Sequence, residues 1–321
     1  MVWFLAKRMV ALALTLVAAS LLVFAVLEVL PGDPALLILG VNAREDTLAA
    51  LRESMGLDQP AYWRYLTWIG GLLSGHLADS LTYDVPVSEL LAPRIAVSLP
   101  LALMALTLAV GLALPLGVLA AARRGRATDV AVMGASQLGV AVPNFWLGIL
   151  LILLFAVTLR WLPSGGFPGW DAGVGPALAA LVMPAVALAL PQAAILARVT
   201  RSAVLEVLGE DYMRTARAKG LSRGEALWRH GLRNAMIPVV TIMGLQFSFL
   251  LAGTIIIENV FNLPGIGRLI FQAIGQRDIV VVRDLVVLLA ATVGVVNFLV
   301  DLSYAILDPR LRHGAARRVH G

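Results

Sequence analysis

Residues 210–238 decide the fold of this chain, and they read EDYMRTARAKGLSRGEALWRHGLRNAMIP between two long apolar runs. Asp211 favours the start of a helix, because negative charge is stabilised at a helix N-terminus. Gly220 readily adopts the left-handed conformation that ends one. Ser222 with Glu225 three residues later is a capping box, which predicts a second helix start. We therefore expect a helix, a glycine hinge and a second helix.

The second helix is expected to be amphipathic. Trp228, Leu232 and Ala235 form an apolar stripe at helical spacing, beside a polar stripe that contains Arg229 and Arg233. One side of this helix pair is thus predicted to pack on protein, and the other side to be charged. A basic helix-turn-helix can bind DNA, but a position between two membrane-length runs makes that reading a poor one.

Composition places the chain in a membrane. Of its 321 residues, 60% are hydrophobic and only 14% are charged, and the mean hydropathy is +0.87. These values exclude an ordinary soluble domain. The absence of cysteine from the sequence excludes disulfides, thiolate metal ligands and thiol nucleophiles. We expect an all-α polytopic membrane protein.

Apolar runs of membrane length predict six transmembrane helices, because about 20 apolar residues cross a bilayer. The first follows Lys7 and Arg8 and continues past residues 18–20, so we expect an uncleaved helix rather than a signal peptide. The six runs lie at about residues 9–30, 95–122, 130–159, 174–197, 236–257 and 285–307. An even number of spans places both termini on one side.

Basic residues show which side that is, because Lys and Arg concentrate in cytoplasmic segments. They fall in alternate segments: Lys7 and Arg8; Arg123, Arg124 and Arg126; Arg198, Arg201, Arg214, Arg217, Lys219, Arg223, Arg229 and Arg233; and Arg310, Arg312, Arg317 and Arg318. Both termini and the central loop are therefore expected in the cytoplasm.

These boundaries predict four regions. They are a tail and first helix at 1–30, an extracytoplasmic segment at 31–94, a five-helix core at 95–307 with a cytoplasmic loop at 198–235, and a cytoplasmic tail at 308–321. Within the second region, apolar residues at helical spacing around 48–55 and 62–69 predict two short amphipathic helices. This segment either packs on the outer ends of the spans or contacts a substrate-delivering protein.

Polar residues inside the spans are candidates for the translocation path, because burying them in hydrocarbon is costly unless they face protein or a cavity. They are Gln137, Asn144, Gln192, Gln246, Asn297 and Asp301. Asp301 is either a proton relay or, more simply, a partner in an interhelical hydrogen bond. Prolines such as Pro143, Pro184 and Pro191 invite kinks, and glycines such as Gly111, Gly117, Gly134 and Gly244 permit close helix contact.

Catalytic motifs are missing from the sequence. Its lysines are Lys7 and Lys219, and neither follows a GxxxxG run, so there is no P-loop and the chain itself does not hydrolyse ATP. No HExxH or GxSxG motif occurs, and the histidines are scattered in polar segments. We expect a protein that is not an enzyme.

The central loop resembles the EAA loop of permease subunits of ATP-binding-cassette importers, in the form used by the dipeptide, oligopeptide and nickel branch. Arg214-Thr215-Ala216 stand where that loop has Glu-Ala-Ala, and Gly220 matches its glycine. The departure at the first position and the longer run to residue 238 are typical of the peptide branch. The outer stretch 258–267 resembles the same branch, although Val280 and Arg283 replace its usual Pro and Gln.

This resemblance covers nearly the whole chain and implies a type I importer permease fold in the bacterial inner membrane. It implies half of a pathway for peptides or a related solute such as a nickel chelate. The implied partners are a homologous second permease in a heterodimer, two cytoplasmic ATPases that bind ATP and Mg, and an extracytoplasmic solute-binding protein. No nucleic acid and no cofactor are implied for this chain. The implied ATPase-coupling residues are Asp211, Arg214, Thr215, Ala216, Lys219, Gly220 and Ser222.

Two other functions remain open from the residues alone. An ion-coupled secondary carrier could use Asp301 and would need no ATPase. A membrane scaffold could bind anionic lipid through its basic loop. The sequence does not distinguish among dipeptide, longer peptide, nickel chelate and sugar as substrate.

Overall fold

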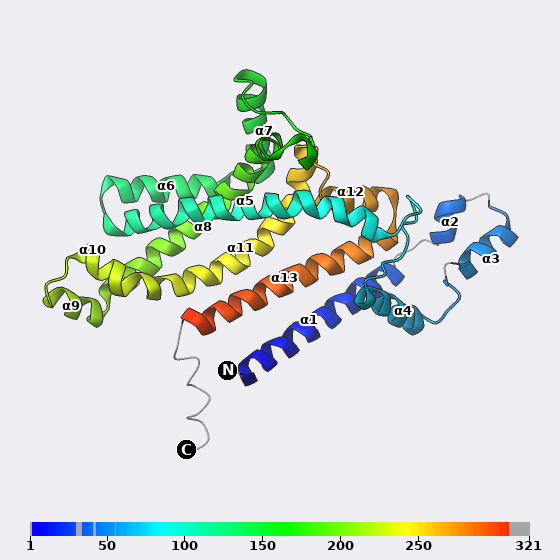
Figure 1. Ribbon diagram of the computed structural model, residues 1–321, viewed down its shortest axis with the longest axis horizontal. Coiled ribbons are helices and arrows are strands. Elements are labelled where there is room, and N and C mark those ends of the chain that lie inside the picture. The colour runs from blue at the N-terminus through cyan, green and yellow to red at the C-terminus, as the bar shows by residue number, and fades with distance from the viewer. Residues whose placement is uncertain (1, 30–33, 41–42, 55, 308–321) are drawn as a thin grey trace, which may run out of the picture. The chain divides into compact units, whose positions relative to one another are not determined.

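A computed structural model describes residues 2–29, 34–40, 43–54 and 56–307 of the chain, and its architecture is helical (Figure 1). The α-helices are α1 (Val2–Val29), α2 (Pro34–Leu39), α3 (Glu45–Ser54), α4 (Ala61–Ser74), α5 (Val87–Ala122), α6 (Ala127–Ala141), α7 (Asn144–Leu151), α8 (Val174–Gly209), α9 (Asp211–Ala218), α10 (Arg223–Ala226), α11 (Leu232–Val260), α12 (Ile266–Gln276) and α13 (Ile279–Leu307). Two π-helical segments, Ile152–Thr158 and Leu227–Gly231, and a short 3₁₀ turn, Trp170–Ala172, complete them.

The chain divides into two compact units. Unit 1 comprises residues 1–9, 99–263 and 295–321, and unit 2 comprises residues 10–98 and 264–294. The long helices α1, α5 and α13 each contribute to both units. Unit 1 therefore contains the predicted central loop, and unit 2 contains most of the predicted extracytoplasmic segment.

Five of the described helices are long and apolar enough to cross a membrane, and a bent pair makes up to six. The bent pair is α6 with α7 and its π-helical extension, which turn by 99° at their break. Pro143 lies in this break and lacks the amide hydrogen that a continuous helix requires. The residues of the predicted third span thus form two helices that meet at this break, where the proline was expected to kink the chain. Pro184 and Pro191, in contrast, lie inside the continuous α8.

Several helices extend beyond their predicted spans. The predicted run 174–197 becomes α8, which continues to Gly209, and the predicted run 236–257 belongs to one helical stretch from Arg223 to Val260. Apolar run length measures the part of a helix that lies in hydrocarbon, whereas the helix itself continues into polar sequence. The loop predicted at 198–235 is consequently mostly helical.

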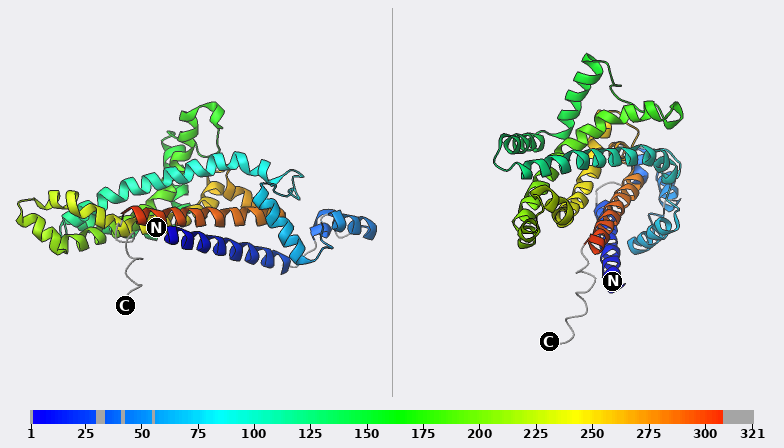
Figure 2. Two further views of the ribbon diagram at one scale, coloured as in Figure 1. Left: turned by 60° about the horizontal axis from the view of Figure 1, so that its bottom comes forward. Right: turned by 60° about the vertical axis from the view of Figure 1, so that its left-hand side comes forward.

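In unit 1, α11 and α8 pack side by side, and small residues allow the close approach of several helices (Figure 2). A Cβ added to Gly117 of α5 would lie 2.7 Å from the Ala197 carbonyl oxygen of α8. A Cβ at Gly244 of α11 would meet the Val300 side chain at 2.7 Å. The expectation of close contact fails at Gly111 and Gly134, where such an atom would have no described neighbour within 4 Å.

In unit 2, α12 and the start of α13 surround an apolar cluster that includes Val87, Leu269 and Leu285. Asp278 holds the junction of these helices, since the Val281 amide donates to its Oδ1 (3.1 Å) and the Ser80 hydroxyl donates to its Oδ2 (2.5 Å). The two predicted amphipathic helices are present as α3 and α4, and α2 precedes them. The short helix predicted after the turn at 258–267 is α12.

Candidate functional site

The helix pair of the central loop begins and ends at the predicted residues. Asp211 is the first residue of α9, and Gly220 has a φ of +96°, the left-handed region that glycine adopts without strain. The Glu225 amide donates to the Ser222 hydroxyl (3.3 Å), and the Ser222 amide donates to the Glu225 carboxylate (2.9 Å). This capping box begins α10, so α9 and α10 form the predicted hairpin around Gly220.

One face of this hairpin is buried in unit 1. Met213 and Ala216 of α9 and Leu227 after α10 are buried. A Cβ at Gly231 would lie 2.9 Å from Leu227 Cδ1 and 3.0 Å from Val207 Cγ1, so these segments are tightly packed. Figures 1 and 2 show the hairpin where α8 ends and α11 begins. The packing fixes the hairpin on the ends of two long helices.

Most of the predicted coupling residues lie on the opposite, exposed face. These exposed residues are Asp211, Arg214, Thr215, Lys219, Gly220 and Ser222. Ala216 is buried instead, because it follows Met213 by three residues on the inner face of α9. The hairpin thus presents a polar surface, and Ala216 supports that surface from beneath.

The predicted apolar stripe is wrong at one position. Trp228 is 72% exposed, whereas Leu227 and Ala235 are buried. The π-helical turn at Leu227–Gly231 shifts the helix register. The side chain that looked like part of a packed face therefore lies on the open surface of the hairpin.

The hairpin is connected to a membrane span without an interruption. Residues from Arg223 to Val260 form a single stretch of 38 residues that is long and apolar enough to cross a membrane. The Asn234 side chain also donates a hydrogen bond to the Tyr212 hydroxyl (3.0 Å), which joins α11 to α9. The hairpin is therefore joined to α11 both through the chain and through this side-chain contact.

An ion pair between α6 and α8 was not among the sequence-predicted features. Arg201 Nε and Nη2 donate to the two Asp129 carboxylate oxygens, at 2.5 and 2.8 Å. The Gly125 amide donates to Asp129 Oδ2 at 2.9 Å. Such a two-pronged contact fixes geometry as well as charge. The available signal was Asp129 itself, a lone acid next to a basic run at the start of a predicted span.

The six polar candidates for the path lie in different surroundings. Gln137 and Asn297 are exposed, and Arg198 Nη1 donates to Gln137 at 3.4 Å. Asn144 is half-buried at the start of α7. Gln246 is buried and Gln192 is half-buried, and each has one amide atom, Nε2 and Oε1 respectively, without a partner among the described residues. Among the described residues, these six side chains do not form one cluster.

Asp301 has a basic partner that the sequence reading did not assign to it. Arg8 Nη1 lies 3.0 Å from Asp301 Oδ2, and both side chains are partly exposed. The interhelical contact expected for Asp301 is therefore an ion pair with α1.

Comparisons with known proteins agree with this architecture. Residues 113–313 match the family described as "Binding-protein-dependent transport system inner membrane component", and residues 1–88 match the N-terminal region of such membrane components. The chain is 39% identical over 307 residues to a probable peptide ABC transporter permease protein, y4tP, of Sinorhizobium fredii, covering 96% of this chain and 98% of that protein. It is 42% identical over 310 residues to the glutathione transport system permease protein GsiC of Salmonella paratyphi A, with the same coverage.

A solved structure has the same fold at lower similarity. The MetNI methionine ABC transporter in inward-facing conformations matches with a TM-score of 0.54 and 20% identity, covering 69% of this chain and 97% of that one. The family match spans more than half of the chain, and relatives near 40% identity span nearly all of it. The chain is a multi-pass membrane component and has no catalytic role of its own. It belongs to the family of inner-membrane components of binding-protein-dependent transport systems.

Proposed function

We propose that this chain forms half of the translocation pathway of an ATP-driven importer of peptides or a peptide-like solute such as glutathione. The hairpin α9–α10 carries this proposal, because it exposes a polar face and continues directly into α11. Relatives named for peptide and glutathione transport, which match along almost their entire length, support the substrate class.

The mechanism follows from the rigidity of this connection. Two cytoplasmic ATPases would contact the exposed face formed by Arg214, Thr215, Lys219 and Ser222. Their ATP-driven closure would displace the hairpin, which is packed through Met213 on the end of α8. Because α8 and α11 pack against each other, both helices would shift and change the access of the pathway.

The hinge is tested by replacing Gly220 with proline in the assembled transporter. The second permease, the ATPases and the binding protein are reconstituted with this chain in proteoliposomes, and uptake and ATP hydrolysis are measured. Proline cannot adopt a φ of +96°, so Gly220→Pro should abolish coupled uptake while membrane insertion is retained. Gly220→Asn is the matched control, because asparagine tolerates left-handed geometry, and it should retain most of the uptake. Normal transport by Gly220→Pro would refute the proposed role of Gly220 in coupling.

Substrate class is tested separately with labelled compounds in the same proteoliposomes. Uptake of di- or oligopeptides or glutathione, dependent on ATP and on the binding protein, is expected. Uptake restricted to a nickel chelate or a sugar would reject the peptide assignment and leave the coupling mechanism in place. Uptake without any ATPase would instead support an ion-coupled carrier.

A further inference from the structure

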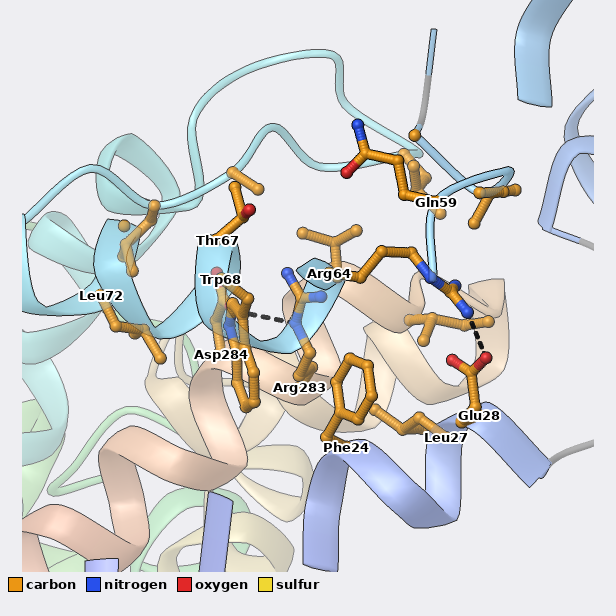
Figure 3. A pocket seen from close by; sticks show the side chains of 18 of the residues that line it. Phe24, Leu27, Glu28, Gln59, Arg64, Thr67, Trp68, Leu72, Arg283 and Asp284 are labelled. Atoms are coloured by element: carbon orange, nitrogen blue, oxygen red, sulfur yellow. Dashed lines mark hydrogen bonds and ion pairs between the residues drawn. The ribbon is translucent and has the colours of Figure 1, made fainter. Parts of the chain in front are cut away.

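Unit 2 contains a pocket of about 870 Å³ that belongs to none of the sites above. It is lined by the end of α1, by α4 and the loop before it, and by the start of α13 (Figure 3). The positive-inside distribution places this end of the spans outside the cytoplasm. Its lining combines apolar side chains with arginines, which makes it a candidate binding site.

Arg283 is a cation of this lining that aromatic and acidic neighbours orient. Its guanidinium group lies over the Trp68 ring, 4.5 Å from the ring centre. Asp284 orients it, since Arg283 Nε lies 3.3 Å from Asp284 Oδ1, and the same oxygen accepts the Trp68 indole N–H at 2.7 Å. These contacts leave Nη1 and Nη2 without a partner among the described residues. The two nitrogens form a pre-oriented fork for an oxyanion.

The lining carries both signs of charge, since Glu28, Asp58 and Asp284 line it together with Arg52, Arg64 and Arg283. The Asp284 side chain is fully buried, whereas that of Arg283 is 19% exposed. Arg64 forms an ion pair with Glu28, and its Nε is buried without a partner in the described part of the chain. Figure 3 shows Arg283 and Arg64 bordering the same pocket. The charge of Arg64 is already balanced by Glu28, so it is the unpartnered Nη1 and Nη2 of Arg283 that favour an anionic group in the pocket.

The apolar part of the pocket continues into a lipid-facing surface. Phe24 and Leu27 of α1 line the pocket, and Val26 and Val29 of the same helix are 52% and 81% exposed. On the outer side of α4, Trp63 is 53% exposed and Leu73 is 85% exposed. An amphipathic helix with exposed aromatic and aliphatic side chains is typical of the membrane interface. Because the pocket lies beside the last turns of the α1 span, we expect the guanidinium fork near the lipid headgroups.

We propose that this pocket binds the phosphodiester group of a phospholipid from the extracytoplasmic leaflet. The Nη1 and Nη2 atoms of Arg283 donate to two phosphate oxygens. The acyl chains lie along α1 beyond Phe24 and Leu27. A dissolved anion would make no contact with the apolar side chains of the pocket, whereas a phospholipid would contact both its charged and its apolar parts.

The proposal is tested by native mass spectrometry of the full chain, delipidated in mild detergent and titrated with phosphatidylglycerol and phosphatidylethanolamine. The wild type should retain one phospholipid. Arg283→Gln should bind it about 10-fold more weakly, since a charge-assisted bidentate contact is lost. Arg283→Lys should fall between the two because it keeps the charge without the fork. Arg44→Gln is the matched control, because Arg44 belongs to the same unit, is exposed and pairs with Asp46 outside the pocket.

A second variant tests whether the lipid occupies the pocket, and two competitors test whether the ligand is a lipid. Thr67→Trp fills the pocket without removing a charge, and it should also weaken lipid binding. Wild-type lipid retention by both Arg283→Gln and Thr67→Trp would overturn the proposal. Displacement of the lipid by millimolar inorganic phosphate would overturn the lipid assignment in favour of a free-anion site. Displacement by a dipeptide, with the same dependence on Arg283, would overturn it in favour of a substrate site.

Discussion

The hairpin in unit 1 and the Trp68–Asp284–Arg283 cluster in unit 2 each contain an Arg–Asp pair, but the two pairs differ in burial. In the hairpin, Arg214 lies 3.4 Å from Asp211 and both side chains are largely exposed to solvent. In the cluster, Asp284 is fully buried and accepts two hydrogen bonds. An exposed pair contributes little to stability, whereas a buried carboxylate that loses its partners is costly. Burial therefore distinguishes Asp284, a carboxylate that holds its cluster together, from the exposed charges of the hairpin, which contribute little to stability.

The largest effect on stability is expected from Asp284→Ala. This change leaves Arg283 and the Trp68 indole without their common acceptor, which should cost about 3–5 kcal/mol. Thermal unfolding of the purified chain in detergent, followed by tryptophan fluorescence, measures it. Asp284→Asn keeps an acceptor for Trp68 and should cost less. Equal melting temperatures for Asp284→Ala and the wild type would show that the cluster does not stabilise the fold.

Gly117→Ala should come next. The added Cβ would approach the Ala197 carbonyl oxygen to 2.7 Å and Thr200 Cβ to 2.6 Å, so α5 and α8 must separate, at a cost of about 1–3 kcal/mol. Gly111→Ala, on the same helix but in open space, should instead be neutral or stabilising by about 0.5–1 kcal/mol. The same unfolding measurement checks both variants. A destabilisation of similar size at the two glycines would contradict the packing account.

Arg214→Glu should have the smallest effect on stability, within about 0.5 kcal/mol, because the side chain is exposed. We nevertheless expect it to uncouple ATP hydrolysis from uptake, because it reverses a charge on the proposed docking face. Uptake and ATP hydrolysis in proteoliposomes measure this. Arg126→Glu, an exposed residue at the start of α6, is the control that should remain coupled. A melting temperature lowered as far as that of Asp284→Ala would show that Arg214 has a structural role.

The elements that local chemistry specifies were predicted well. The limits of α9, the left-handed Gly220 and the capping box at Ser222 all follow from short-range hydrogen bonding. The spans were located correctly, but the end of α8 was placed too early and the start of the helical stretch that contains α11 too late, because apolar run length does not limit a helix. The broken span at Pro143 was indicated by the missing backbone donor.

Contacts between distant segments could not be predicted. Asp129 meets Arg201, and Trp68 meets Asp284, across 72 and 216 residues of sequence, so no local pattern reveals them. Trp228 was misplaced because a π-helical turn shifts the register after α10. The coupling role of the hairpin and the path residues remain predictions.

The most direct test of the central claim uses the absence of cysteine from the sequence. A single Thr215→Cys substitution on the exposed face of α9 is labelled with a benzophenone maleimide and irradiated in the assembled transporter. We predict a crosslink to an ATPase subunit whose yield changes when ATP is added, and no such crosslink from an equally labelled Arg126→Cys variant. A labelled Thr215→Cys chain that crosslinks only to the other membrane subunit or the binding protein, or that gives no product, would contradict the account.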